Sequence, residues 1–249
     1  MLKLFLTSVI LSASLLAGEI SVAVAANLTD AVETLKTEFA KTNPAIKVNT
    51  VLGASGKFTT QIKNGAPFDI FLSADMKFPE NLYADGIAVT KPVVYASGAL
   101  AMVSTRGLDL SKGIAIIADP KVEKVAIANP KTAPYGTASI EAFKNANILD
   151  KVEPKLVQGD SIGQALQFSL TAADVGFVNA SAFYSDKMKE YKKGVQWVDV
   201  DPKLYKPIDQ GIVLLKQAEN NADAKAFYEF VLSAKAKEIF KNYGYLVNE

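Results

Sequence analysis

The feature that most constrains the fold is a strand that runs directly into a helix, at residues 20–35. Small and β-branched residues alternate from Ile20 to Ala25, which is typical of a strand covered on both faces. From Asn27 onward, apolar residues recur three and four positions apart, which predicts a helix with Asn27 as its N-cap. The start of such a helix presents unpaired N–H groups and a partial positive charge at the end of the strand. Because a capped helix needs no ligand, this stretch alone predicts an α/β domain and leaves a binding role open.

The same succession of an apolar strand and a helix start recurs at four later places, near Gly53, Ala133, Gly159 and Asn179. Strand, helix and strand in this order predict parallel crossover units, so the expected fold class is α/β. Helix starts at the carboxyl ends of such strands favour the binding of an anion. Ser55, which follows Gly53 closely, is either a contact of that kind or a plain N-cap.

Residues 1–17 predict a secretory signal peptide, because Lys3 precedes an uncharged apolar run that ends in small residues at Ala17 and Gly18. The run is shorter than the roughly 20 residues of a comfortable transmembrane helix, and Glu19 follows at once, so membrane retention is the weaker alternative. The sequence has no Cys to carry a lipid. We therefore expect a protein that is soluble in the periplasm after cleavage and is not a lipoprotein.

The charge balance and the missing residue types exclude several classes of function. The chain has 27 basic and 26 acidic residues, and removal of Lys3 with the leader leaves 26 of each, whereas nucleic-acid-binding proteins normally carry a basic excess. Cys and His are both absent, which excludes thiolate nucleophiles, zinc sites with sulfur or nitrogen ligands, and His acid–base catalysis. A secreted hydrolase that uses Ser55 with Lys57 or Lys63 is an alternative from a different class, but this spacing matches no catalytic motif. We expect a protein that is not an enzyme, needs no cofactor and binds no nucleic acid.

Two apolar runs are candidates for carrying the chain between two lobes. Residues 93–104 contain two successive strand patterns separated only by Gly98, which is longer than one domain usually needs. Residues 211–215 form another apolar run, after Pro202 and Pro207, and are expected to lead back to the first lobe. The sequence has no Pro- or Ser-rich linker, so the lobes are expected to lie close together and to share strands.

Three motifs resemble the periplasmic molybdate-binding proteins of ABC importers, which belong to the type II periplasmic binding-protein family. They are VAANLTDA at residues 24–31, NGAPFDIFLSAD at residues 64–75 and AKEIFKNYGY at residues 236–245. The resemblance covers almost the whole chain after the leader, from Gly18 to Val247. It implies an α/β fold with two lobes, each a mostly parallel sheet flanked by helices, and two crossing strands as the hinge that closes on binding.

On this chain the family fold implies that lobe 1 comprises residues 18–97 and 208–249, and that lobe 2 comprises residues 98–207. The implied function is capture of molybdate, and also of tungstate, in the interlobe cleft and delivery to an inner-membrane ABC permease. A monomer is expected. A receptor for another oxyanion or small solute is the alternative within the same class.

By the same resemblance, the oxyanion is bound by Asn27, Ser55, Tyr135, the backbone N–H of Ile162, and Asn179. These groups would contact the oxygens of molybdate and would not ligate the metal directly. The chain departs from the commonest family pattern at three of these positions. Asn27 stands where Ser is usual, Tyr135 where a small residue is usual, and Asn179 where Tyr is usual.

Donor groups alone suit a fully ionised tetrahedral oxyanion, because such an ion carries only acceptors. Phosphate at neutral pH keeps a proton and therefore requires an acceptor as well. No carboxylate falls among the five implied contacts. Discrimination between molybdate and sulfate would then depend on the size of the pocket.

Overall fold

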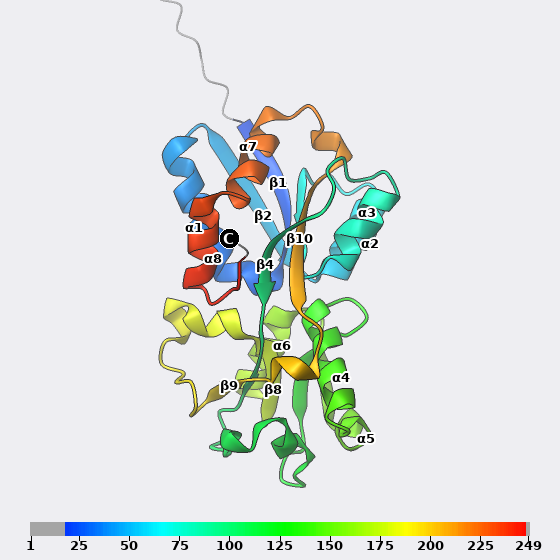
Figure 1. Ribbon diagram of the computed structural model, residues 1–249, viewed down its shortest axis with the longest axis vertical. Coiled ribbons are helices and arrows are strands. Elements are labelled where there is room, and N and C mark those ends of the chain that lie inside the picture. The colour runs from blue at the N-terminus through cyan, green and yellow to red at the C-terminus, as the bar shows by residue number, and fades with distance from the viewer. Residues whose placement is uncertain (1–17, 248–249) are drawn as a thin grey trace, which may run out of the picture.

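Two α/β units, stacked along the long axis of the molecule, make up the computed structural model (Figure 1). The structure describes residues 18–247, so the predicted signal peptide at residues 1–17 lies outside the described part. Each unit contains one five-stranded sheet with helices packed on it. The predicted fold class, a two-lobed α/β periplasmic binding-protein fold, is confirmed.

The first sheet has the strand order β2-β1-β3-β10-β4. Its strands are β1 (Gly18–Ala25), β2 (Ile46–Gly53), β3 (Ile70–Leu72), β4 (Val93–Gly98) and β10 (Ile208–Leu214). Strand β1 pairs in parallel with β2 and β3, whereas β10 pairs antiparallel with both β3 and β4. Every strand of this sheet except β10 therefore runs in the same direction, as a mostly parallel sheet requires.

The second sheet has the strand order β7-β6-β8-β5-β9. Its strands are β5 (Leu100–Val103), β6 (Val125–Ala128), β7 (Leu156–Gly159), β8 (Val175–Asn179) and β9 (Trp197–Asp199). Strand β6 pairs in parallel with β7 and β8, and β5 pairs antiparallel with β8 and β9. This sheet repeats the plan of the first, with β5 as its reversed strand.

Helices cover both sheets. The α-helices are α1 (Thr29–Thr42), α2 (Ser55–Lys63), α3 (Lys77–Ala84), α4 (Pro134–Asn145), α5 (Leu149–Val152), α6 (Ile162–Thr171), α7 (Ala222–Val231) and α8 (Ala234–Asn242). The 3-10 helices are η1 (Ala26–Leu28), η2 (Leu110–Ala118), η3 (Glu153–Lys155), η4 (Ala180–Tyr184), η5 (Asp186–Met188), η6 (Pro202–Leu204) and η7 (Lys216–Ala218). In Figure 1, α1, α7 and α8 lie on one side of the first sheet and α2 and α3 on the other.

Strand β1 is buried on both faces, as its sequence predicts. Val22 and Val24 belong to the apolar cluster that includes α1, α7 and α8, whereas Ala23 belongs to the cluster that includes α2. In the first cluster Phe39 meets Phe227 edge to face, with ring centroids 5.1 Å apart. Each such buried aromatic ring contributes about 1.5–3 kcal/mol by leaving water, so the cluster stabilises the packing of α1 and α7 on the face of β1.

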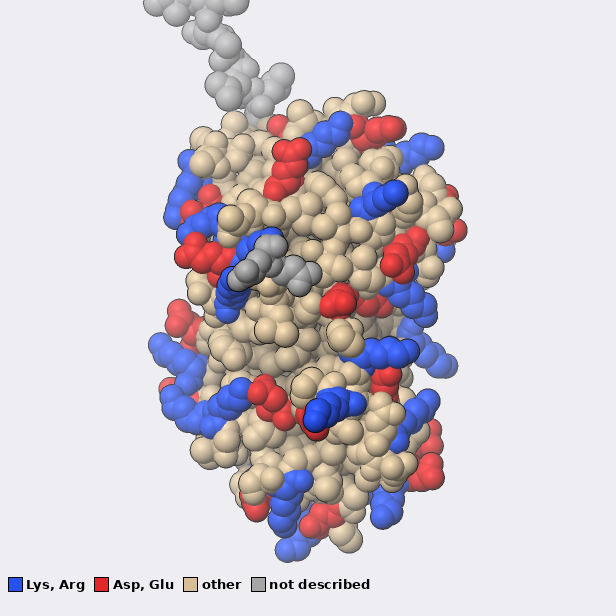
Figure 2. Space-filling model, in the orientation of Figure 1, with Lys and Arg blue, Asp and Glu red and all other residues tan. Residues whose placement is uncertain are grey.

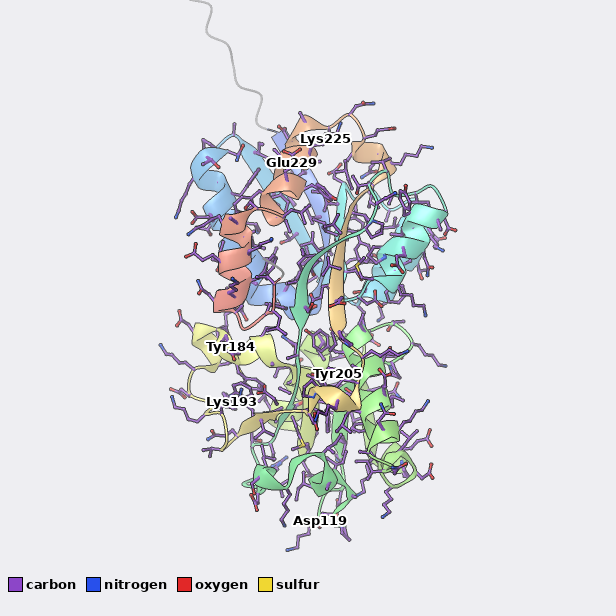
Figure 3. The ribbon with its side chains drawn as sticks, viewed as in Figure 1. Asp119, Tyr184, Lys193, Tyr205, Lys225 and Glu229 are labelled. Carbon is purple, nitrogen blue, oxygen red and sulfur yellow. The ribbon has the colours of Figure 1, made fainter. Side chains whose placement is uncertain are left out.

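The chain passes between the two units twice, and the two crossings lie next to each other near the middle of the view (Figure 1). The first crossing joins β4 to β5 through Ala99, and the second enters β10 from Pro207. Tyr205, labelled in Figure 3, connects them, because its hydroxyl accepts the N–H of Leu100 at 3.0 Å. Strands β4 and β10 then run side by side, with a register break at Gln210 and Gly211.

One local prediction was wrong. Asn27 is not an N-cap: it lies inside η1, and α1 begins two residues later without a side-chain cap. The tertiary hydrogen bonds of the Asn27 side chain, described below, replace the local cap.

Candidate functional site

A small cavity lies between the two units, at the carboxyl ends of β1 and β2. Its volume is about 10 Å³, and its lining comes from both units: Ala25, Ala26, Asn27, Gly53, Ala54, Ser55, Ala74, Ala133, Pro134, Tyr135 and Ile162. Asn27, Ser55, Tyr135 and Ile162 were all predicted from the sequence as site residues, and the structure brings them together. Asn179 is not part of this lining and lies instead in a neighbouring cavity of about 250 Å³, which also contacts Asn27.

Three helices begin at this cavity. Ser55 is the first residue of α2, Tyr135 the second of α4 and Ile162 the first of α6. N–H groups in the first turn of a helix have no intrahelical acceptor, and within residues 18–247 no protein acceptor pairs with the backbone N–H of these three residues. The three helix starts therefore supply unpaired donors and partial positive charge to one small volume.

The Ser55 side chain adds a fourth donor. Its hydroxyl oxygen accepts the N–H of Ala74 at 3.0 Å, and the residue is 1% exposed. Since the oxygen is already an acceptor for Ala74, the hydroxyl proton is free to be donated to a further acceptor. Ala74 follows β3, so the NGAPFDIFLSAD motif serves to orient this serine.

The start of α2 also touches the second unit directly. The N–H of Gly56 donates to the carbonyl oxygen of Thr132 at 2.8 Å. A Cβ at position 56 would lie 2.9 Å from the Cα of Thr132, so only glycine permits this approach. The two walls of the cavity are thus in backbone contact at its edge.

Tyr135 fills the gap between α4 and the crossing strands. Its hydroxyl accepts a hydrogen bond from Nε2 of Gln210 at 3.2 Å. Burial raises the pKa of the Tyr135 hydroxyl well above its ordinary value, so the group stays protonated and neutral. The hydroxyl therefore remains a hydrogen-bond donor at every physiological pH.

Asn27 is the most connected of the lining residues. Its Nδ2 donates to Oε1 of Gln210 and to the hydroxyl of Tyr245, each at 2.9 Å. Its backbone oxygen accepts the hydroxyl of Tyr245 at 2.9 Å and Nδ2 of Asn179 at 3.3 Å. The structure thus places Asn179 against the backbone of Asn27, where it joins the second unit to the first.

One acceptor in this region has no partner. Oδ1 of Asn27 is buried and makes no hydrogen bond to any described residue. Leaving a buried acceptor unpaired costs about 1–3 kcal/mol. A hydrogen-bond donor that reaches Oδ1 would recover that energy. A flip of the Asn27 side-chain amide, with matching changes in its hydrogen-bond partners, would recover it as well.

Sequence reasoning missed two residues of this network, Gln210 and Tyr245. Both are buried, with exposures of 0% and 3%. Tyr245 ends the AKEIFKNYGY motif, so the motif itself pointed to it. Gln210 is an uncharged polar residue within a strand of mostly apolar residues, and that contrast was the available signal.

Charged side chains do not line the small cavity, but two ion pairs connect the units around it. Lys57 pairs with Asp160 at 2.8 Å, and Lys187 pairs with Asp30 at 2.8 Å. Within residues 18–247 no cluster of acidic side chains is able to hold a metal ion. The cavity therefore presents mainly donors, which suits an anion whose atoms are acceptors.

Residues 20–246 match the family described as bacterial extracellular solute-binding protein. The chain belongs to this family. Its relatives include the molybdate-binding protein ModA of Rhodobacter capsulatus, 41% identical over 92% of this chain and 89% of that protein. ModA of Azotobacter vinelandii is 38% identical over 92% of this chain and 90% of that protein. The sequence resemblance to molybdate-binding proteins is thereby confirmed.

Solved structures agree with the fold. The Azotobacter vinelandii periplasmic molybdate-binding protein superimposes with a TM-score of 0.84 at 31% identity, over 92% of this chain and all of that one. The sulfate-binding protein SubI of Mycobacterium tuberculosis gives a TM-score of 0.73 at 15% identity, which shows the shared fold alone. The close relatives are solute-binding proteins rather than enzymes. Between residues 18 and 247, no helix has the length and apolar character needed to cross a membrane.

Proposed function

We propose that the protein binds molybdate, and also tungstate, in the small cavity between its lobes and delivers it to an ABC permease. The observation that carries the proposal is the convergence of four unpaired donors on that cavity. They are the backbone N–H groups of Ser55, Tyr135 and Ile162 and the Ser55 hydroxyl. The names of the relatives identify the anion.

The energetics of such a site are favourable without an arginine. A hydrogen bond to a charged group contributes about 1.5–3 kcal/mol, so four of them contribute roughly 6–12 kcal/mol before desolvation is counted. Removing the ion from water offsets part of this sum. Donors on rigid helix starts lose little freedom on binding, which preserves the remainder.

Binding is expected to accompany movement of the two lobes about the crossing strands. We assign residues 18–97 and 208–249 to lobe 1 and residues 98–207 to lobe 2. A volume of about 10 Å³ holds about one water molecule, so the lobes must separate for an ion with four oxygens to enter. The Lys57–Asp160 and Lys187–Asp30 pairs are contacts that would form on closure.

We further propose that the chain acts as a monomer in the periplasm, free of lipid once residues 1–17 are removed, and that it has no catalytic activity and no cofactor. Basic and acidic side chains are interspersed over the face visible in Figure 2, so that face shows no basic surface for nucleic acid. The Ser55 hydroxyl is hydrogen-bonded to Ala74 rather than to a base, which disfavours a nucleophile.

A second candidate ligand is a protonated oxyanion such as hydrogen phosphate. The unpaired Oδ1 of Asn27 favours it, because a hydrogen-bonded proton would satisfy that acceptor. The charge of the ion does not distinguish molybdate from hydrogen phosphate.

Calorimetric titration of the chain from residue 18 with molybdate, tungstate, sulfate and phosphate tests the proposal. We expect saturable binding of molybdate and tungstate with weaker binding of sulfate and phosphate. A free ligand concentration of a hundred times the dissociation constant stabilises the folded state by about 2.7 kcal/mol, and thermal denaturation also detects this increase. Binding of phosphate or sulfate without binding of molybdate would refute the proposed ligand.

A further inference from the structure

Gln210 is the third residue of the crossing strand β10 and is fully buried. Its position coincides with an irregularity in the sheet. Gln210 pairs with Ala96 and Gly211 with Val94, so Tyr95 is an extra residue on β4. A bulge of this kind re-aims neighbouring side chains, and such bulges are frequent beside functional sites.

The Gln210 amide makes three hydrogen bonds. Its Oε1 accepts from Nδ2 of Asn27 at 2.9 Å and from the hydroxyl of Tyr95 at 2.8 Å. Its Nε2 donates to the hydroxyl of Tyr135 at 3.2 Å. Asn27 belongs to lobe 1 and Tyr135 to lobe 2, and both line the small cavity. One planar amide in the hinge therefore joins a residue from each wall.

The space around this amide is kept open by Gly98, the last residue of β4. A Cβ at position 98 would collide with the Tyr135 hydroxyl and would lie 2.6 Å from Nε2 of Gln210. The hydrogen bonds, the bulge and the glycine are separate features of the two crossing strands. They occur together where Gln210 lies between Asn27 and Tyr135.

We propose that Gln210 is a positioning residue that sets the separation of the two cavity walls and thereby selects tetrahedral oxyanions by size. The inference rests on the proposed function, since it concerns the same cavity. Molybdate and sulfate carry the same charge and shape, but sulfate is smaller, so only the spacing of the donors distinguishes them. The cavity as it stands has room for about one water molecule, so the walls must part for either ion, and a wall freed from Gln210 is able to follow the smaller ion inward.

The test compares Gln210→Met with Tyr95→Phe. The Met side chain has a similar volume and removes the bonds to Asn27 and Tyr135. Tyr95→Phe removes a bond from the same amide but leaves those two in place, so it is the matched control. Affinities for molybdate and sulfate are measured by calorimetry, and thermal denaturation reports the stability of each variant.

Gln210→Met displaces the donors rather than removing one of them. It is expected to weaken molybdate binding about five- to tenfold, comparable in size to one neutral hydrogen bond, and to lower the preference for molybdate over sulfate. Tyr95→Phe is expected to lower stability and leave that preference unchanged. If the Met variant does not fold, Gln210→Asn takes its place. It keeps a buried amide but is too short to hold both partners, so we expect the same loss of preference for molybdate over sulfate.

The inference is overturned if folded Gln210 variants keep the wild-type preference, if Tyr95→Phe loses it equally, or if the wild type binds the two ions equally well. A wild-type protein that binds no oxyanion instead refutes the proposed function. These results are distinct, so the two proposals fail separately.

Discussion

Replacement of Ser55 by alanine separates the two roles that the structure gives to its hydroxyl. The oxygen accepts the N–H of Ala74 at 3.0 Å, and the proton is available to the bound anion. Loss of a hydrogen bond to a charged ligand costs about 1.5–3 kcal/mol, which corresponds to a roughly 10- to 150-fold weaker dissociation constant. Loss of the acceptor leaves a buried N–H unpaired, which lowers the free energy of unfolding by about 1–3 kcal/mol.

The two effects are measured independently. Calorimetric titration with molybdate at 25 °C gives the affinity, and urea denaturation without ligand gives the free energy of unfolding. Ser169→Ala is the matched control, because Ser169 is also buried but its hydroxyl only donates to the Ala165 carbonyl oxygen at 2.7 Å within α6. That substitution orphans no N–H and lies away from the cavity lining, so both quantities should change little.

A folded Ser55→Ala protein that binds molybdate within twofold of wild type would refute the assignment of Ser55 to the anion. Weaker binding with an unchanged free energy of unfolding would instead contradict the role of Ser55 in supporting Ala74. Equal losses of affinity in Ser55→Ala and Ser169→Ala would show that the effect arises from the core rather than from the site.

Three further predictions concern the contacts around the cavity. Asn179→Ala should weaken molybdate binding less than tenfold, which is the value of about one neutral hydrogen bond. The reason is that Asn179 donates to the backbone oxygen of Asn27 at 3.3 Å and does not line the cavity. A larger loss of affinity by calorimetry would indicate a direct contact with the anion. Asp160→Asn should weaken molybdate binding by a factor below about five, since exposed ion pairs such as Lys57–Asp160 contribute up to about 1 kcal/mol. The effect should vanish in high salt. A loss of affinity that does not depend on salt would argue against the ion pair. Burial raises the pKa values of the Tyr95 and Tyr135 hydroxyls, so the stability they contribute is complete below about pH 10, the ordinary pKa of tyrosine, and is lost as the pH rises further. Because the chain has no His, calorimetry should give a constant affinity for molybdate between about pH 6 and 9. Thermal denaturation should show falling stability above about pH 10. A steep change in affinity near neutral pH would contradict this account.

Local rules explain the part of the site that the sequence predicted. The starts of α2, α4 and α6 follow buried strands, and Pro134 and Ser161 are residues that favour the first turn or the cap of a helix. Because these signals lie within a few residues of each helix start, the strand-to-helix junctions and Ser55 were accessible from local patterns, whereas Tyr135 and Ile162 were assigned as contacts through the family resemblance.

The hydrogen-bond network behind the cavity was not accessible in this way. Asn27 and Gln210 are 183 positions apart, and Asn27 and Tyr245 are 218 positions apart. No local pattern predicts that these side chains meet, nor that a bulge at Tyr95 turns Gln210 inward. The same distant partners explain why Asn27 fails as an N-cap, since its amide is used by them instead of by α1.

The order of strands along the chain also dictates an order of assembly. All strands of the second sheet lie between Leu100 and Asp199, whereas the first sheet is incomplete until β10 is added. Before then, the apolar strand β3 has a neighbour on one side only, and its free edge invites pairing with other chains. The Tyr245 hydroxyl donates to the backbone oxygen of Asn27, so the support of this cavity residue is complete only after residue 245 has been added to the chain.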